Sequence, residues 1–144
     1  MYTITSQLEI EDKDKSALDH LMRVYSSCVR YVFQRIITQE EPKKHNDFHK
    51  LLKEKFELNY RYMEEAIQEA KAKASSCKEL KTDPKQVIFG SRKIFNNLKK
   101  RHISEYQRRE LKEKYREQRQ CNLYSRGDKN NYGNHNIQIQ GNQL

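Results

Sequence analysis

Cysteine is scarce in this chain of 144 residues, which holds only Cys28, Cys77 and Cys121. The three lie far apart, are odd in number and include no Cys-x-x-Cys pair, so neither a disulfide framework nor a cysteine zinc site is expected. The chain also lacks an apolar run near the ~20 residues that span a bilayer, and its start does not resemble a secretory signal. These absences predict a soluble, cytoplasmic protein with no membrane partner.

Catalytic motifs are missing too. The sequence contains no Gly-x-Ser-x-Gly, no Gly-x-x-x-x-Gly-Lys-Ser/Thr and no Gly-x-Gly-x-x-Gly. His45 and His49 have the i,i+4 spacing that can chelate a metal from one helical face. No glutamate lies between them and no third ligand is evident, so we interpret them as a surface pair at the start of a polar helix. The sequence predicts no catalytic residue, no metal site and no cofactor.

Apolar side chains are few, and positive charge is concentrated in one segment. With 35% hydrophobic residues, the chain can fold as amphipathic helices around a thin core or depend on a partner for part of its burial. Residues 1–84 carry equal numbers of basic and acidic residues, whereas residues 85–129 carry 14 basic and 5 acidic ones, a net charge of +9. Such a segment favours a polyanion, because each Lys or Arg that meets a phosphate releases counterions. The alternative is a solvated helix that its own glutamates partly neutralise.

Periodicity predicts a strand followed by five helices. Apolar and polar residues alternate over residues 2–10, as in a strand. Over residues 14–38, apolar residues recur at spacings of three and four, which predicts a long amphipathic helix. Capping residues mark the starts of the four shorter helices: Asn46, Asn59, Ser91 and Ser104.

The apolar stripes of the first and third helices contain small residues and tyrosines. The third helix carries small residues, among them Ala66, Ala70 and Ala74, so another surface can approach its backbone closely. The stripe of the first and third helices also includes tyrosines that we expect in the core with their hydroxyls at the surface: Tyr25, Tyr31 and Tyr62.

The fourth and fifth helices carry basic residues around most of their polar circumference. Their thin apolar stripe argues against docking on an anionic membrane, which needs a wide apolar face. We therefore predict that they lie along nucleic-acid phosphates, through Arg92, Lys93, Lys99, Lys100, Arg101, Arg108, Arg109, Lys112, Arg116 and Arg119. Arg126 extends this set. Tyr124 is predicted in a loop, and two alternatives stay open for it: its ring stacks on an unpaired base, or it makes no contact with nucleic acid.

Two segments carry a family resemblance: FGSRKIF at residues 89–95 and NLYSRGDKNNYGNHN at residues 122–136. The chain resembles, over nearly all of its length, the N-terminal part of the TnpB proteins of the IS200/IS605 transposon family, RNA-guided nucleases related to the Cas12 effectors. This resemblance implies a mainly α-helical recognition lobe of about five helices, inserted between short terminal β-strands of an incomplete β-barrel. Residues 1–12 would form a barrel strand, residues 13–120 the lobe, and residues 121–144 a turn and a strand returning to the barrel, ending before any RuvC domain.

The resemblance also implies a function. A recognition lobe binds guide RNA, the RNA–DNA duplex or the target-adjacent DNA motif, and here it would act without its own nuclease centre. A separate RuvC-containing polypeptide is a candidate partner. By approximate position, the residues that would contact the adjacent-motif duplex are Asn59, Tyr60, Arg61, Tyr62 and Gln68. The alternative is a protein–protein module that buries the stripes of the third and fifth helices against a separate nuclease chain or a second copy.

Overall fold

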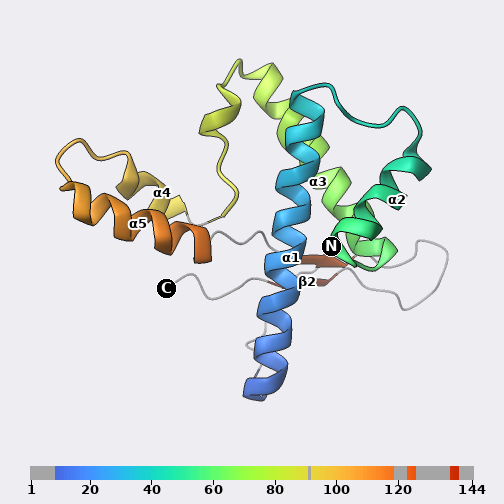
Figure 1. Ribbon diagram of the computed structural model, residues 1–144, viewed down its shortest axis with the longest axis horizontal. Coiled ribbons are helices and arrows are strands. Elements are labelled where there is room, and N and C mark those ends of the chain that lie inside the picture. Colours follow the sequence, from blue (N-terminus) through green and yellow to red (C-terminus); the bar gives the residue numbers. More distant parts are fainter. Residues whose placement is uncertain (1–8, 91, 119–122, 126–136, 140–144) are drawn as a thin grey trace, which may run out of the picture.

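The chain is mainly helical in the part that the computed structural model describes, residues 9–90, 92–118, 123–125 and 137–139 (Figure 1). The predicted helical class is therefore confirmed. The elements are α1 (Asp12–Ile37), α2 (His45–Phe56), α3 (Tyr60–Glu79), the 3-10 turn η1 (Pro84–Gln86), α4 (Arg92–Leu98), α5 (Glu105–Gln118), β1 (Leu123–Ser125) and β2 (Ile137–Ile139). None of the described helices is both long and apolar enough to cross a membrane.

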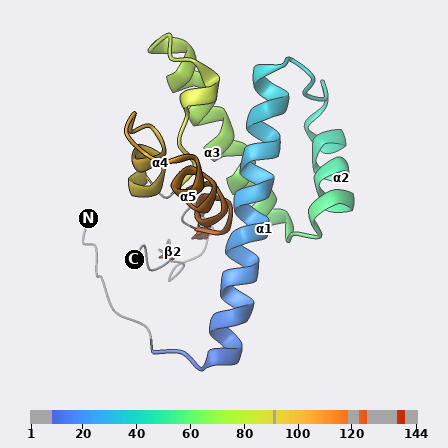
Figure 2. The ribbon, with the colours of Figure 1, turned by 60° about the vertical axis from the view of Figure 1, so that its left-hand side comes forward.

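The three longer helices form a bundle in which α1 runs up, α2 down and α3 up again in the view of Figure 1. Both α2 and α3 lie beside the second half of α1, while its first turns extend beyond the bundle and are exposed (Figures 1 and 2). The α4–α5 hairpin lies on the side of α1 opposite α2 in both views. The bundle and the hairpin are therefore distinct parts of the fold.

The core is built from large side chains of α1 that face a stripe of α3 in which alanines alternate with Met63 and Ile67. Tyr25, Val29 and Val32 on α1 are fully buried, as are Ala66 and Ala70 on α3. Alternating large and small residues across facing positions lets two helices approach closely without leaving voids. The small-residue stripe of α3 thus packs on α1 of the same chain and not, as in the alternative of a protein–protein module, against another chain.

Further residues close the core on its other sides. Phe48 and Leu52 of α2 are buried against it. Phe89, which follows η1, meets Phe33 edge to face with ring centroids 5.0 Å apart. Gly90 comes next with φ of 86°, a left-handed conformation that glycine adopts at low cost, and the chain turns there from the core toward α4. The start of the FGSRKIF segment is therefore a structural anchor.

The predicted core tyrosines are at least half-buried. Tyr62 packs half-buried on the core, and Tyr31 lies edge to face with Phe56, centroids 5.6 Å apart. Tyr25 departs from the prediction in one respect, because its hydroxyl is buried and donates to Glu69 Oε2 at 3.0 Å. Burial of a phenol requires such a partner.

The predicted helix caps are confirmed at two of the three described positions. Asn59 Oδ1 accepts from the Arg61 amide at 3.0 Å. Ser104 and Gln107 form a reciprocal capping box at the start of α5, with contacts of 3.1 and 3.2 Å. Asn46 does not cap α2, because the helix already begins at His45 and the Lys44 carbonyl accepts its first backbone bonds. Ser91 lies outside the described residues.

The two short strands pair with each other. β1 and β2 are antiparallel, with Leu123 opposite Ile139 and Ser125 opposite Ile137, and β1 lies beside α3. Tyr124 therefore belongs to a strand and not to a loop as predicted. Most of the predicted strand at residues 2–10 lies outside the described residues, and its last two, Glu9 and Ile10, have no regular structure. The barrel that would join the two ends stays a prediction.

Overpacking the α1–α3 interface tests this core. We expect Ala70→Leu to destabilise the fold by about 1–3 kcal/mol, because no space exists for three extra carbons against α1. The control is Ala72→Leu, at an exposed position of the same helix, which should change the stability by less than about 0.5 kcal/mol. Urea unfolding followed by circular dichroism measures both. Equal stabilities of the two variants would contradict the packing.

Candidate nucleic-acid interface

The α4–α5 hairpin is held by a small set of contacts between its two helices. The rings of Phe95 and Tyr115 lie 5.8 Å apart, and Lys99 Nζ sits 4.6 Å from the Phe95 ring centroid. Arg108 Nη1 donates to the carbonyl of Leu98 at 3.2 Å, which satisfies an acceptor at the end of α4. The thin apolar stripes of both helices therefore face each other.

The register of α5 separates its side chains into three parallel stripes. Positions i, i+3 and i+7 share one face of a helix. Arg108, Leu111 and Tyr115 form the half-buried stripe that faces α4. The residue after each of these three is basic, so that Arg109, Lys112 and Arg116 form a basic stripe. The residue after each basic one is acidic, so that Glu110, Glu113 and Glu117 form an acidic stripe. Most charges of opposite sign therefore lie on different faces of the helix. The exceptions are Glu105, four residues before Arg109, and Lys114, four residues after Glu110.

The described basic side chains of the hairpin are not neutralised by direct ion pairs. Within residues 92–115, no basic side chain lies within ion-pair distance of a described carboxylate. Glu110 is instead a hydrogen-bond partner of Tyr106, and this bond and the carboxylate charge raise the pKa of the Tyr106 phenol above its ordinary value. The positive charge of the hairpin is therefore available to a ligand.

Most of the residues predicted to contact phosphates are exposed, and one of them has a structural role. Arg92, Lys93, Lys99, Lys100, Arg101, Arg109 and Lys112 are exposed. Arg108 differs, because it is half-buried and its guanidinium is bonded to Leu98. Arg116 lies in α5 on the same face as Lys112, while Arg119 and Arg126 are outside the described residues.

The residues predicted to contact the adjacent-motif duplex do not form one surface that is open to a ligand. Asn59 uses its side-chain oxygen to cap α3, and Tyr62 packs half-buried against the core. Gln68 is exposed, but its amide donates to Glu64 Oε1 at 3.0 Å. Arg61 is exposed at the start of α3 and lies seven residues before Gln68, on the same face.

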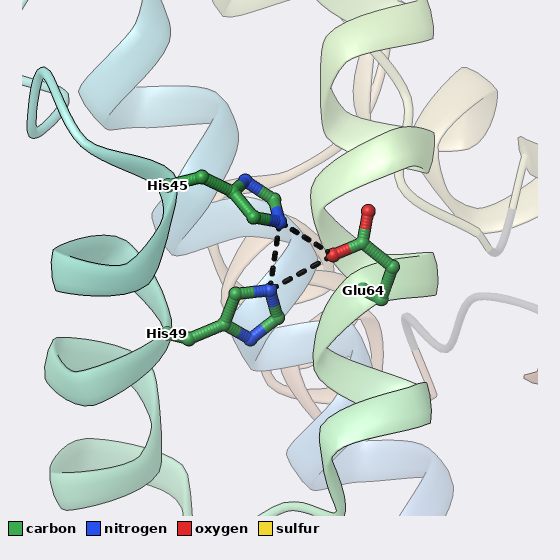
Figure 3. Close-up of side chains that lie close together, drawn as sticks. All are labelled: His45, His49 and Glu64. Carbon is green, nitrogen blue, oxygen red and sulfur yellow. Dashed lines mark hydrogen bonds and ion pairs between the residues drawn. The ribbon is translucent and has the colours of Figure 1, made fainter.

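Tyr60 takes part in a second cluster that the sequence did not predict. Its ring stacks on His49 at 4.4 Å with an interplanar angle of 20°, although 59% of the residue stays exposed. His49 is buried, so the interpretation of His45 and His49 as a surface pair is wrong for His49. Both rings contact Glu64, which the α2–α3 turn brings to them from 15 residues beyond His49 (Figure 3). No spacing within α2 signals this third residue.

Comparison with known protein families gives a match to nearly the whole chain. A family model described as the SSO2105 N-terminal domain matches residues 1–143, a range that takes in all the helices and both strands described above. No curated protein and no solved structure matches the chain. The family description names no ligand and no activity.

Removing the Glu110 charge tests the geometry of α5. We expect Glu110→Gln to lower the pKa of Tyr106, because an ionised phenol is no longer placed beside a carboxylate. Glu113→Gln, a charge change of the same size on the acidic stripe, should leave that pKa unchanged. Carbon-13 NMR of labelled tyrosine against pH measures both. An equal change in the two variants would contradict the Tyr106–Glu110 contact.

Proposed function

We propose that this chain, which belongs to the family of the SSO2105 N-terminal domain, is a nucleic-acid-binding module whose α4–α5 hairpin contacts the phosphate backbone. The observation that carries the proposal is the separation of charge on α5. The described side chains of the basic stripe, Arg109 and Lys112, make no direct ion pair and present positive charge to a ligand, whereas closely interleaved charges would cancel. Exposed basic residues that follow α4 enlarge this surface: Lys99, Lys100 and Arg101.

The resemblance to TnpB proteins supports a specific class of ligand. The FGSRKIF segment runs into α4, and the NLYSRGDKNNYGNHN segment follows α5 in the sequence. We propose that the ligand is guide RNA, an RNA–DNA duplex or the DNA next to a target, read mainly through its shape and backbone. We propose a RuvC-containing polypeptide as the candidate partner that cuts the target.

Arg61 is our candidate for reading a base edge. Its side chain is exposed at the start of α3, and a guanidinium can donate two bonds to guanine in the major groove. We give Gln68 a smaller role than the sequence suggested, because its amide is bonded to Glu64. Asn59 and Tyr62 act in the fold, as a cap and a core residue.

The alternative, a protein–protein module, requires the apolar stripes of α3 and α5 to be open to another chain, and they are not. The small-residue stripe of α3 is buried on α1, and the α5 stripe faces α4. The large apolar residues exposed in the described part of the chain, Ile10, Tyr60, Leu80 and Tyr106, belong to four different elements or connections. Scattered single residues do not make an interaction patch.

Removing the basic stripe tests the phosphate contacts. With about 4–6 contacts, the plot of log K against log salt should have a slope of roughly −3 to −5 for duplex DNA. We expect the triple change Arg109→Gln, Lys112→Gln and Arg116→Gln to flatten this slope by about 2–3 and to weaken binding to all sequences alike. Arg108 is kept, because it holds the hairpin together.

The matched control removes the same charge elsewhere. Lys13, Lys15 and Lys50 are exposed residues of α1 and α2, and changing all three to Gln should leave the slope within about 1 of the parent. Fluorescence anisotropy with a DNA duplex and an RNA hairpin over a KCl series measures each variant. If the two triple variants bind alike, the basic stripe is a solvated face and the proposal fails.

A separate change tests base reading at Arg61. We expect Arg61→Gln to alter the order of preference among short DNA motifs, while the salt slope changes by no more than about 1. Selection from a duplex library with a randomised motif measures the preference, and Lys71→Gln, another exposed position on α3, is the control. An unchanged motif order in Arg61→Gln would remove Arg61 from the interface.

A further inference from the structure

Three potential metal ligands converge between α2 and α3 (Figure 3). His49 Nε2 lies 2.8 Å from Glu64 Oε2, and His45 Nε2 lies 2.9 Å from the same oxygen. The two Nε2 atoms are 3.0 Å apart. The i,i+4 spacing places both rings on one face of α2, and the α2–α3 turn places the carboxylate opposite them.

Hydrogen bonds alone do not satisfy this triangle. Each of its contacts needs a proton between the two atoms, and a neutral imidazole supplies at most one from its Nε2. If both rings carry that proton, both donate to Glu64 and the two N–H groups crowd each other across 3.0 Å. If one ring lacks it, its lone pair faces the lone pairs of the carboxylate. A cation in contact with all three atoms turns each lone pair into a bond.

We propose that His45, His49 and Glu64 form a site for a divalent transition-metal ion of the zinc type. Two imidazoles and one carboxylate are a ligand set that Zn²⁺ takes in proteins, with a water molecule in the fourth position. With bonds of 2.0–2.1 Å, the ligand atoms of a tetrahedral zinc ion lie about 3.3 Å apart, so the triangle needs to open by only about 0.3–0.5 Å. The side chains of His45 and Glu64 are 44% and 30% exposed, which leaves the water position open to solvent.

Neighbouring groups hold the ligands in this orientation. Gln68 donates to Glu64 Oε1, which leaves Oε2 directed at the two rings. Burial alone would raise the pKa of Glu64, but the bonds from Gln68, His49 and His45 outweigh it and lower that pKa. Tyr60 stacks on His49 and fixes its plane. Such positioning of ligands is typical of metal sites.

The ion would act as a clamp between two helices. The described contacts of α2 with the rest of the bundle depend on few buried side chains, chiefly Phe48 and Leu52, and a metal bonded to both α2 and α3 adds a strong link. His45 is the first residue of α2, where the positive end of the helix dipole opposes a cation. We therefore expect affinity on the order of micromolar, below that of a four-ligand structural site.

Metal binding by the whole chain, prepared metal-free and without a histidine tag, tests the proposal. Titration with Co²⁺ should give the visible absorption bands of a tetrahedral site at one ion per chain, and Zn²⁺ should displace them. At a Zn²⁺ concentration near 100 times Kd, we expect the melting temperature to rise by about 5–10 °C. Mg²⁺ should give neither effect, because it prefers oxygen ligands.

Variants identify the ligands. His45→Gln, at an exposed position, should weaken Co²⁺ binding at least tenfold and abolish the Zn²⁺-induced rise in melting temperature, while its metal-free melting temperature stays that of the parent. His20→Gln and His102→Gln, at exposed positions outside the cluster, should bind as the parent does. The absence of saturable Co²⁺ and Zn²⁺ binding by the parent would overturn the proposal. Binding by His45→Gln at parental affinity, or an equal loss in the two control variants, would do so as well.

Discussion

The contact of α1 with α3 is the interaction on which the rest of the described structure depends. Nearly all of the fully buried residues belong to these two helices: α1 supplies most of the large ones, and α3 supplies alanines together with Ile67. Burial of an apolar side chain stabilises a fold by about 1.5–3 kcal/mol, so a chain this poor in apolar residues gains most of its stability in one place. The buried Tyr25–Glu69 bond spans the same two helices and satisfies a polar group that close packing would otherwise isolate.

The position of the His–His–Glu cluster follows from that contact. Because α3 is fixed on α1, and α2 is folded back by Phe48 and Leu52, the start of α2 comes opposite the second turn of α3. Glu64 then meets two rings whose spacing already placed them together. The proposed metal site is thus formed by the bundle, and an ion bound there would in turn stabilise the position of α2, the helix with the fewest buried residues of the three.

The α4–α5 hairpin follows a different principle. It has one aromatic contact, a capping box and the Arg108–Leu98 bond, but no residue of α4 and none of the described side chains of α5 is buried. Elements with few buried contacts have low local stability and are suited to binding. Since the bundle holds the core and the hairpin holds the excess positive charge, residues of the basic stripe can be changed without disturbing the fold. This separation is what makes the salt-dependence experiment interpretable.

Local signals in the sequence determined the helices and the composition of the hairpin. Apolar spacing predicted α1, and the side chains of Asn59 and Ser104 predicted where α3 and α5 begin, because periodicity and capping act within a few residues. The basic and acidic stripes of α5 also follow from spacing alone. The tertiary structure decided which residues of different helices and strands lie side by side. It assigned the alanines of α3 to α1 and not to another chain, gave Arg108 a structural role, placed Tyr124 in a strand and brought Glu64 to His45 and His49. Each of these depends on contacts between residues of different elements, and such contacts are set by the packing of the whole bundle, which no local pattern encodes.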